Sequence, residues 1–252
     1  MSGNEAQDRA AIRALVENWA VWRDAGDWTR FATCWHADGF MMATWCQAPA
    51  AEFIEASRAG WERGVSILHF LGGHSADLAG DRAIAQTKMT ISQRAAVHGV
   101  TVDVVCTGRF YDFLEKRSGR WGVVLRQPIY EKDRMDPVDP AATLALDPAL
   151  LARFPEGYRH LAYLQTGIGY AVKADMPGLQ GVAVEALYAR GARWLAGGPH
   201  GGATATGSAD GAWCRGCRRG AGGDWRRRRL RGRPCATRFG EHGSRGPYRG
   251  PN

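Results

Sequence analysis

The N-terminal part of the chain has the apolar period of helices. Apolar side chains recur at steps of three and four residues between Ile12 and Trp22, which predicts an amphipathic helix over residues 5–24. Gly26 ends that helix, and Asp27 is suited to cap a second, short helix directly after it. The sequence therefore predicts two consecutive helices at the start of the chain.

A strand and a third helix are expected next. The second helix should run to about Trp35, and Asp38-Gly39 has the composition of a turn. Residues 40–45 are mostly apolar and predict a strand, and Pro49 suits the first turn of a third helix. This part of the chain adds one strand and one helix to the predicted fold.

From residue 65 onward the pattern is that of strands. Four long strands are predicted, separated by short turns that contain glycine, over residues 65–78, 82–94, 97–115 and 121–132. Sequential antiparallel strands with short turns form a curved meander. Because helices come first and strands second, we predict an α+β fold, in which N-terminal helices pack on a cone-shaped, curved antiparallel sheet over residues 1–135.

A second region is predicted after the last strand. Asp136-Pro137 breaks the strand pattern, and helical patterns resume at about 147–154, 158–173 and 180–195. We expect a helical extension over residues 136–196. It either covers the mouth of a cavity or mediates dimerisation, and the sequence leaves both open.

The segment 197–252 differs from the rest in composition. It holds twelve arginines, no lysine and three acidic residues, whereas the whole chain carries a net charge of +8, so the first 196 residues are almost neutral. We expect a disordered Gly/Arg-rich tail. It arises either from a GC-rich gene read in a shifted frame or as a genuine arm for RNA or another polyanion, so nucleic acid is a partner only if the tail is genuine. Its residues Cys214, Cys217, Cys235 and His242 lack the context of a zinc site.

Several classes of protein are not indicated. No apolar run reaches the roughly 20 residues of a membrane span, and no secretory signal is visible, so we expect a cytoplasmic protein. The sequence contains neither a dinucleotide-binding Gly-x-Gly-x-x-Gly after a strand, nor a Walker loop, nor a Gly-x-Ser-x-Gly elbow. We therefore expect neither cofactor nor metal.

Two residues are the main candidates for chemistry. Asp24 lies at the end of the first predicted helix, and His69 lies in the strand-like run 66–71. A carboxylate behind an imidazole fixes its tautomer and raises its basicity, which makes a general base. If the fold brings the two together in an apolar cavity, the chain removes protons from carbon. Otherwise His69 is a core histidine and Asp24 only ends a helix.

Several segments resemble the SnoaL-like group of the nuclear transport factor 2-like superfamily. They are Trp22-Arg-Asp-Ala-Gly-Asp27, Leu68-His-Phe-Leu-Gly-Gly-His74, Asp77-Leu-Ala-Gly-Asp-Arg-Ala83, and Gly108-Arg-Phe-Tyr111 followed by Arg117-Ser-Gly-Arg-Trp121. The resemblance covers roughly residues 5–135. Enzymes of this group of the hexachlorocyclohexane dehydrochlorinase and scytalone dehydratase type use an Asp–His pair in a cone-shaped pocket, which implies that role for Asp24 and His69. The second histidine of the dehydratase pattern has no clear match, because His98 falls in a predicted turn.

The resemblance implies a cofactor-independent lyase, either a dehydratase or a dehydrohalogenase, acting on a small hydrophobic cyclic substrate. Two alternatives remain: an isomerase or cyclase for an aromatic or polyketide substrate, and a non-catalytic binding or assembly module like the small subunit of ring-hydroxylating dioxygenases. A cone with one open sheet face often associates through that face, so a homodimer or homotrimer is expected.

Other side chains are candidates for the pocket. Arg126, in the last strand, would stabilise a developing negative charge if it points inward. Aromatic residues are candidates for the pocket wall, namely Trp45, Tyr111 and Tyr130.

His74 is the last candidate for the pocket wall. It is five residues from His69, so on a regular strand the two imidazoles lie on opposite faces. A bulge at Gly72-Gly73 would bring both onto one face and permit a second acid or a metal site. We favour the simpler interpretation that two histidines alone bind no metal.

Overall fold

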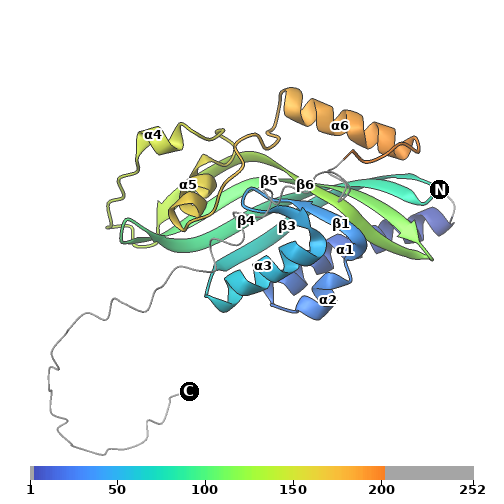
Figure 1. The fold of residues 1–252 in the computed structure, drawn as a ribbon, viewed down its shortest axis with the longest axis horizontal. Coiled ribbons are helices and arrows are strands. Elements are labelled where there is room, and N and C mark those ends of the chain that lie inside the picture. Colours follow the sequence, from blue (N-terminus) through green and yellow to red (C-terminus); the bar gives the residue numbers. More distant parts are fainter. Residues whose placement is uncertain (1–2, 202–252) are drawn as a thin grey trace, which may run out of the picture. The chain divides into compact units, whose positions relative to one another are not determined.

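The computed structural model describes residues 3–201, and Figure 1 shows a curved sheet with helices on both sides. The N-terminal elements are α1 (Gly3–Asp24), α2 (Trp28–Ala32), β1 (Trp35–Met42), β2 (Gln47–Pro49) and α3 (Ala50–Glu62). The meander consists of β3 (Ser66–Ala79), β4 (Arg82–Val97), β5 (Val100–Arg117) and β6 (Arg120–Pro137). The extension adds α4 (Pro148–Leu151), α5 (Arg159–Gly167) and α6 (Val182–Leu195).

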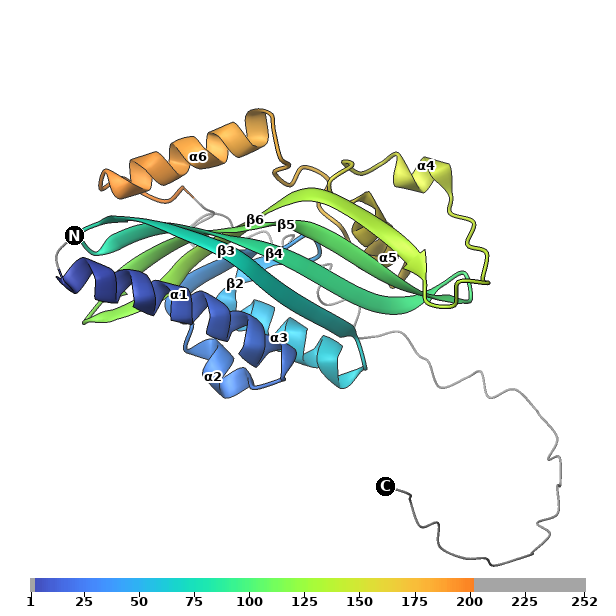
Figure 2. The ribbon, with the colours of Figure 1, turned by 180° about the vertical axis from the view of Figure 1, so that it is seen from behind.

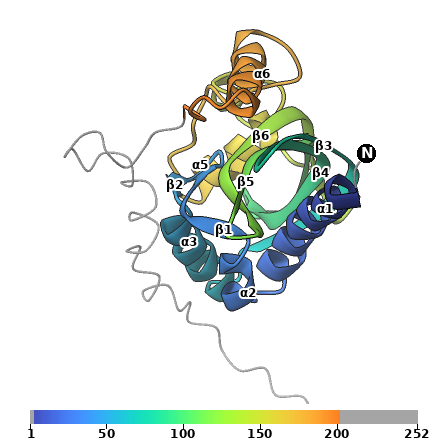
Figure 3. The ribbon, with the colours of Figure 1, turned by 90° about the vertical axis from the view of Figure 1, so that its right-hand side faces the viewer.

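The sheet has six strands in the order β2-β1-β6-β5-β4-β3. The four long strands pair antiparallel in sequence, through turns at which His98, Ser118 and neighbouring glycines have positive φ. Seen from its end, the sheet curls around its own interior (Figure 3). The predicted α+β cone is therefore confirmed.

The start of the sheet differs from the prediction. α2 ends at Ala32, and β1 contains the Asp38-Gly39 pair that was expected to form a turn. The pair instead marks an irregularity in the pairing of β1 with β6, which is parallel rather than antiparallel. A Cβ at Gly39 would lie 2.9 Å from the carbonyl oxygens of His36 and Val123, so glycine is needed for this close approach.

The helices are divided between the two faces of the sheet. α1, α2 and α3 lie on one side and α6 on the other (Figures 1 and 2). We call the face that α1 covers the inner face and the face under α6 the outer face. Because both faces are covered at β6, every residue from Trp121 to Tyr130 is buried, which a half-exposed strand would not show.

The extension is divided in the same way. Leu161 and Leu164 of α5 join the core of the inner face, whereas Leu187 and Trp194 of α6 pack on outer-face residues such as Phe113. Helix α5 therefore packs on the inner face, and the two roles left open for the extension stay predictions. Because α6 occupies the outer face over β4–β6, the face expected to form an oligomer is partly covered, and the oligomeric state stays a prediction.

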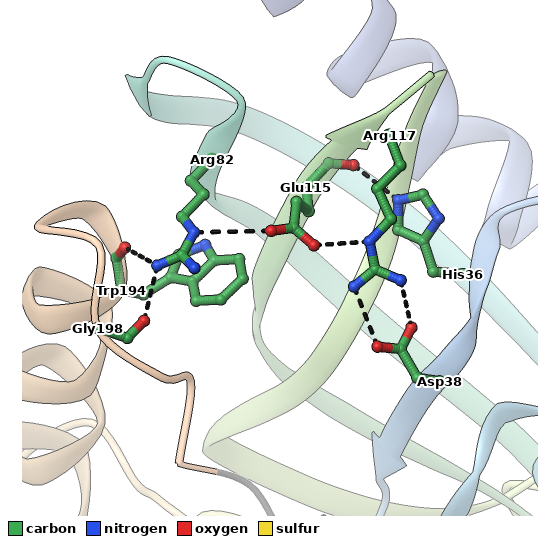
Figure 4. A network of polar contacts seen from close by, with 7 residues as sticks. All are labelled: His36, Asp38, Arg82, Glu115, Arg117, Trp194 and Gly198. Carbon is green, nitrogen blue, oxygen red and sulfur yellow. Dashed lines mark hydrogen bonds and ion pairs between the residues drawn. The ribbon is translucent and has the colours of Figure 1, made fainter. Parts of the chain in front are cut away.

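Arg82 anchors the C-terminal end of α6 (Figure 4). Its Nη1 donates hydrogen bonds to the carbonyl oxygens of Trp194, at 3.1 Å, and Gly198, at 2.7 Å, and its guanidinium lies 4.0 Å from the Trp194 ring. Glu115 pairs with Arg82 and with Arg117, so the anchor is continuous with the ion pairs at the end of β5. Cations suit helix C-termini, where carbonyl groups lack intrahelical partners.

No helix within residues 3–201 is long and apolar enough to cross a membrane. The predictions for the Arg-rich tail, including its four candidate zinc ligands, fall almost entirely outside the described residues.

Candidate active site

The structure brings Asp24 and His69 together. Nδ1 of His69 lies 2.8 Å from Oδ1 of Asp24, and the backbone N–H of His69 donates to Oδ2 of the same carboxylate at 2.5 Å. Both side chains are largely buried, with 7 % of His69 and 14 % of Asp24 exposed. One oxygen of the Asp24 carboxylate therefore holds the imidazole ring, and the other holds the backbone of β3 at His69.

Local structure explains the pairing. Asp24 is the last residue of α1, and positive φ at Gly26 turns the chain directly after it. His69 lies on β3, the edge strand, with its side chain on the inner face opposite Ile91 of β4. Helix α1 crosses the inner face next to β3, so the end of the helix reaches the strand at His69.

Burial sets the protonation of the imidazole. Desolvation lowers the pKa of His69 below its ordinary value, and the charges of Arg23 and Arg126 lower it further, while the hydrogen bond that the ring donates to Asp24 opposes the shift. The ring is therefore neutral near pH 7. Because Nδ1–H donates to Asp24, Nε2 carries the free lone pair and is the basic nitrogen.

His69 lines an inner cavity of about 30 Å³, and a smaller passage of about 10 Å³ lies beside it. The cavity wall is mostly apolar and includes Trp19, Met41, Ala43, Phe53, Ile67, Ile91, Phe110, Pro128 and Leu161. An apolar cavity of about 150 Å³ accommodates benzene, so a cyclic ligand requires the wall to move. Gln165 of α5 lines both spaces, and Tyr170, just after α5, lines the passage, so this part of the wall belongs to the extension.

Of the four predicted wall residues, two line the cavity, and Tyr111 and His74 do not. Trp45 and Tyr130 face it, and burial raises the pKa of the Tyr130 hydroxyl, so this group stays protonated. Tyr111 was expected in the wall, but it lies on the outer face against Tyr188 of α6. The prediction was wrong because side chains alternate along β5, so Tyr111 points away from the cavity that its neighbour Phe110 lines.

Arg126 points inward, but it is held by another residue. Its guanidinium makes two hydrogen bonds with the carboxylate of Asp112, at 2.6 and 2.7 Å, and both side chains are fully buried. Its Cζ lies 4.2 Å from the ring of Trp19 and 4.0 Å from that of Phe110. Arg126 thus lies behind two aromatic wall residues. Its positive charge acts on the cavity through its electrostatic field and not through contact with a ligand.

His74 shares the inner face with His69 but not the cavity. The pairing with β4 shifts at Gly72-Gly73, and this bulge places both imidazoles on one face. Nδ1 of His74 lies 2.8 Å from Oγ1 of Thr87, and the ring does not line the cavity around His69. No group of three or more potential metal ligands occurs within residues 3–201.

Four polar wall residues were not recognised in the sequence, namely Arg23, Thr44, Gln93 and Gln165, and two of them carried a signal. Arg23 follows Ile12, Val16 and Trp19 at helical spacing, so it lies on the apolar stripe of α1. Gln93 follows Ile91 by two residues and shares its face of β4. A polar residue at an apolar position was the available signal in both cases.

Comparison with known proteins identifies the class to which this fold and site belong. Residues 4–127 match the model of the SnoaL-like domain. The chain therefore belongs to the SnoaL-like family of the nuclear transport factor 2-like superfamily.

Among curated relatives, pea pathogenicity protein 2 of Fusarium vanettenii is 40% identical over 177 residues, which are 69% of this chain and 76% of the relative. An uncharacterized protein of Emericella nidulans is 35% identical over 210 residues, 77% of this chain and 88% of the relative. Both aligned stretches are longer than the matched domain, so the similarity reaches beyond it. A solved structure titled as a putative scytalone dehydratase, from Novosphingobium aromaticivorans, is 14% identical, covering 57% of this chain and 100% of its own, with a TM-score of 0.47.

Proposed function

We propose that this protein is a cofactor-independent lyase in which His69 removes a carbon-bound proton and Asp24 orients and stabilises the base. The observation that carries the proposal is the pair of contacts from Asp24 to the imidazole and to the backbone of His69, at the wall of a mostly apolar cavity. A non-catalytic binding or assembly module predicts a buried His69 without connection to a cavity, whereas His69 lines one, and this favours the enzyme.

The reaction is an elimination. Nε2 of His69 takes the proton, the electron pair of the C–H bond forms a double bond to the neighbouring carbon, and the bond to the leaving group on that carbon breaks. The leaving group departs as halide, or a hydroxyl departs as water by taking up the proton that His69 has removed. The imidazolium formed is stabilised by the Asp24 carboxylate 2.8 Å away. The apolar wall excludes water, which strengthens this interaction.

The test uses small cyclic alcohols and halides that carry an acidic C–H bond. Proton NMR in D₂O follows the loss of the C–H signal and the appearance of an alkene. We expect turnover by the wild type and a loss of about 10²–10⁴-fold in His69→Gln, the usual contribution of a positioned base. Arg13→Gln, an exposed change on the same helix, is the control and should retain full activity. Equal activity of His69→Gln and the wild type contradicts the proposal.

A further inference from the structure

Arg23 is a buried cation with weak hydrogen bonds. Its side chain is only 8 % exposed, and it lines both the cavity and the passage. Among residues 3–201 its side chain has two hydrogen bonds, both from Nη1, to Oδ1 of Asp24 at 3.4 Å and to the carbonyl oxygen of Ile67 at 3.3 Å. A guanidinium has five N–H donors, and contacts of this length are at the outer limit of hydrogen bonding. Most of the hydrogen-bonding capacity of Arg23 is therefore unused.

Two further polar groups line the same passage. Ser57 of α3 is 2% exposed and Gln93 of β4 is 1% exposed. Ser57 Oγ and Gln93 Oε1 have no hydrogen-bond partner in the part of the chain that the structure describes. Buried polar groups are normally hydrogen-bonded, since an unpaired one costs about 1–3 kcal/mol. Arg23, Ser57 and Gln93 all line this passage, whose volume of about 10 Å³ must increase before it admits a ligand group.

We propose that Arg23, Ser57 and Gln93 form a binding site for a carboxylate group of the substrate, beside the base His69. A guanidinium binds a carboxylate through two parallel hydrogen bonds, and the Ser57 hydroxyl donates another. The Gln93 amide turns about its last torsion to present Nε2 as a donor. This inference rests on the proposed function and deepens it by naming a substrate class, a small cyclic carboxylic acid.

The electrostatics of the passage agree with this ligand. Burial lowers the pKa of Arg23 below its ordinary value, which means that its charge is poorly solvated. Asp24 offsets part of that cost, but its carboxylate is committed to His69. A ligand carboxylate supplies the missing partner, while the ring of the ligand takes the apolar cavity next to the base. The carboxylate thus fixes which C–H bond faces Nε2.

The test compares benzoate with benzamide, which has nearly the same shape but no charge, by isothermal titration calorimetry. We expect the wild type to bind benzoate at least about tenfold more tightly than benzamide, the usual effect of a charge-assisted hydrogen bond. Arg23→Gln should remove this preference, Arg23→Lys should keep part of it, and Arg13→Gln should keep all of it. Circular dichroism checks that each variant is folded.

A second variant covers the case in which Arg23→Gln does not fold. Ser57→Ala should weaken benzoate binding about two- to tenfold and leave benzamide binding unchanged. Equal affinity of the wild type for the two probes, or a full benzoate preference in both Arg23→Gln and Ser57→Ala, overturns the inference. Neither result concerns His69, whose coupling to Asp24 is measured separately, so failure of this site and failure of the proposed base are distinguishable.

Discussion

At the scale of single residues, the site combines one base with two buried charge pairs. Arg23 lies beside Asp24 near the base, and Arg126 pairs with Asp112 behind the aromatic wall. Each pair is neutral overall, so His69 lies in an apolar environment without a large net charge. Removing one member of either pair leaves a single charge without compensation in a medium of low polarity.

The Arg126–Asp112 pair gives a prediction for stability. Asp112→Asn should lower the free energy of unfolding by about 3–5 kcal/mol, because the fully buried guanidinium of Arg126 loses its partner. The double variant Asp112→Leu/Arg126→Met should be less destabilised than Asp112→Asn, since it buries no charge. Urea unfolding measures both, and a single variant as stable as the wild type would show that the pair is not buried as described.

The sequence was informative about some of these residues. Asp24 and His69 were predictable because each lies in a segment that resembles the family and because their chemistry matches a base and its orienter. The orientation of Tyr111 was not predictable, since its strand is covered on both faces and its polar neighbour Asp112 is itself buried, so polarity does not mark the outer face. The position of Arg23 in the wall was predictable only from its charge at an apolar position of the helical stripe.

At the scale of elements, the predictable parts are those with a regular period. The four long strands have turns marked by glycine, so the predicted meander is close to the observed one. The first strand was predicted too late in the chain, because Asp38-Gly39 is equally typical of a turn and of a bulge, and in β1 it forms an irregularity within the strand. The positions of α5 and α6 on opposite faces could not be read from their sequences, since both are amphipathic and irregular segments connect them to the sheet and to each other.

The packing of α6 depends on Gly191. A Cβ at this position would lie 1.9 Å from the hydroxyl of Tyr111, so Gly191→Ala should push the helix off the outer face. Although alanine favours helices, overpacking of this kind costs typically about 1–3 kcal/mol. Thermal unfolding of Gly191→Ala should therefore begin at a lower temperature than that of the wild type.

Gly167→Ala, in α5, is the matched control, because nothing lies within 4 Å of a Cβ built there. It should leave the melting temperature unchanged or raise it slightly. If Gly191→Ala is as stable as Gly167→Ala, then α6 does not pack on Tyr111 in solution.

At the scale of the whole molecule, four histidines predict the response to acid. Burial lowers the pKa of His36, His69, His74 and His200 in the folded chain. The unfolded chain therefore binds more protons between those lowered values and the ordinary value of about 6.5. The neutral, buried imidazoles therefore contribute to the stability of the folded chain above about pH 6.5. This contribution is lost as the pH falls through the pKa values that the four histidines have in the folded chain.

Thermal melts between pH 7.5 and 5 test this expectation. The melting temperature should be nearly constant above about pH 6.5, the ordinary pKa of histidine, and should decrease progressively below it. His69→Gln should reduce that decrease, because one buried imidazole no longer gains a proton on unfolding. A melting temperature that rises on acidification would contradict the burial of these rings.

An NMR titration of the His69 ring in the wild type and in Asp24→Asn measures whether Asp24 orients and supports His69 as a base. Asp24 opposes the lowering of the His69 pKa, so this pKa should fall further when the carboxylate is replaced by an amide. The ring should also respond to an added small aromatic ligand, since it lines the cavity. An unchanged titration in Asp24→Asn would mean that the two side chains do not interact, and the proposed base would be abandoned.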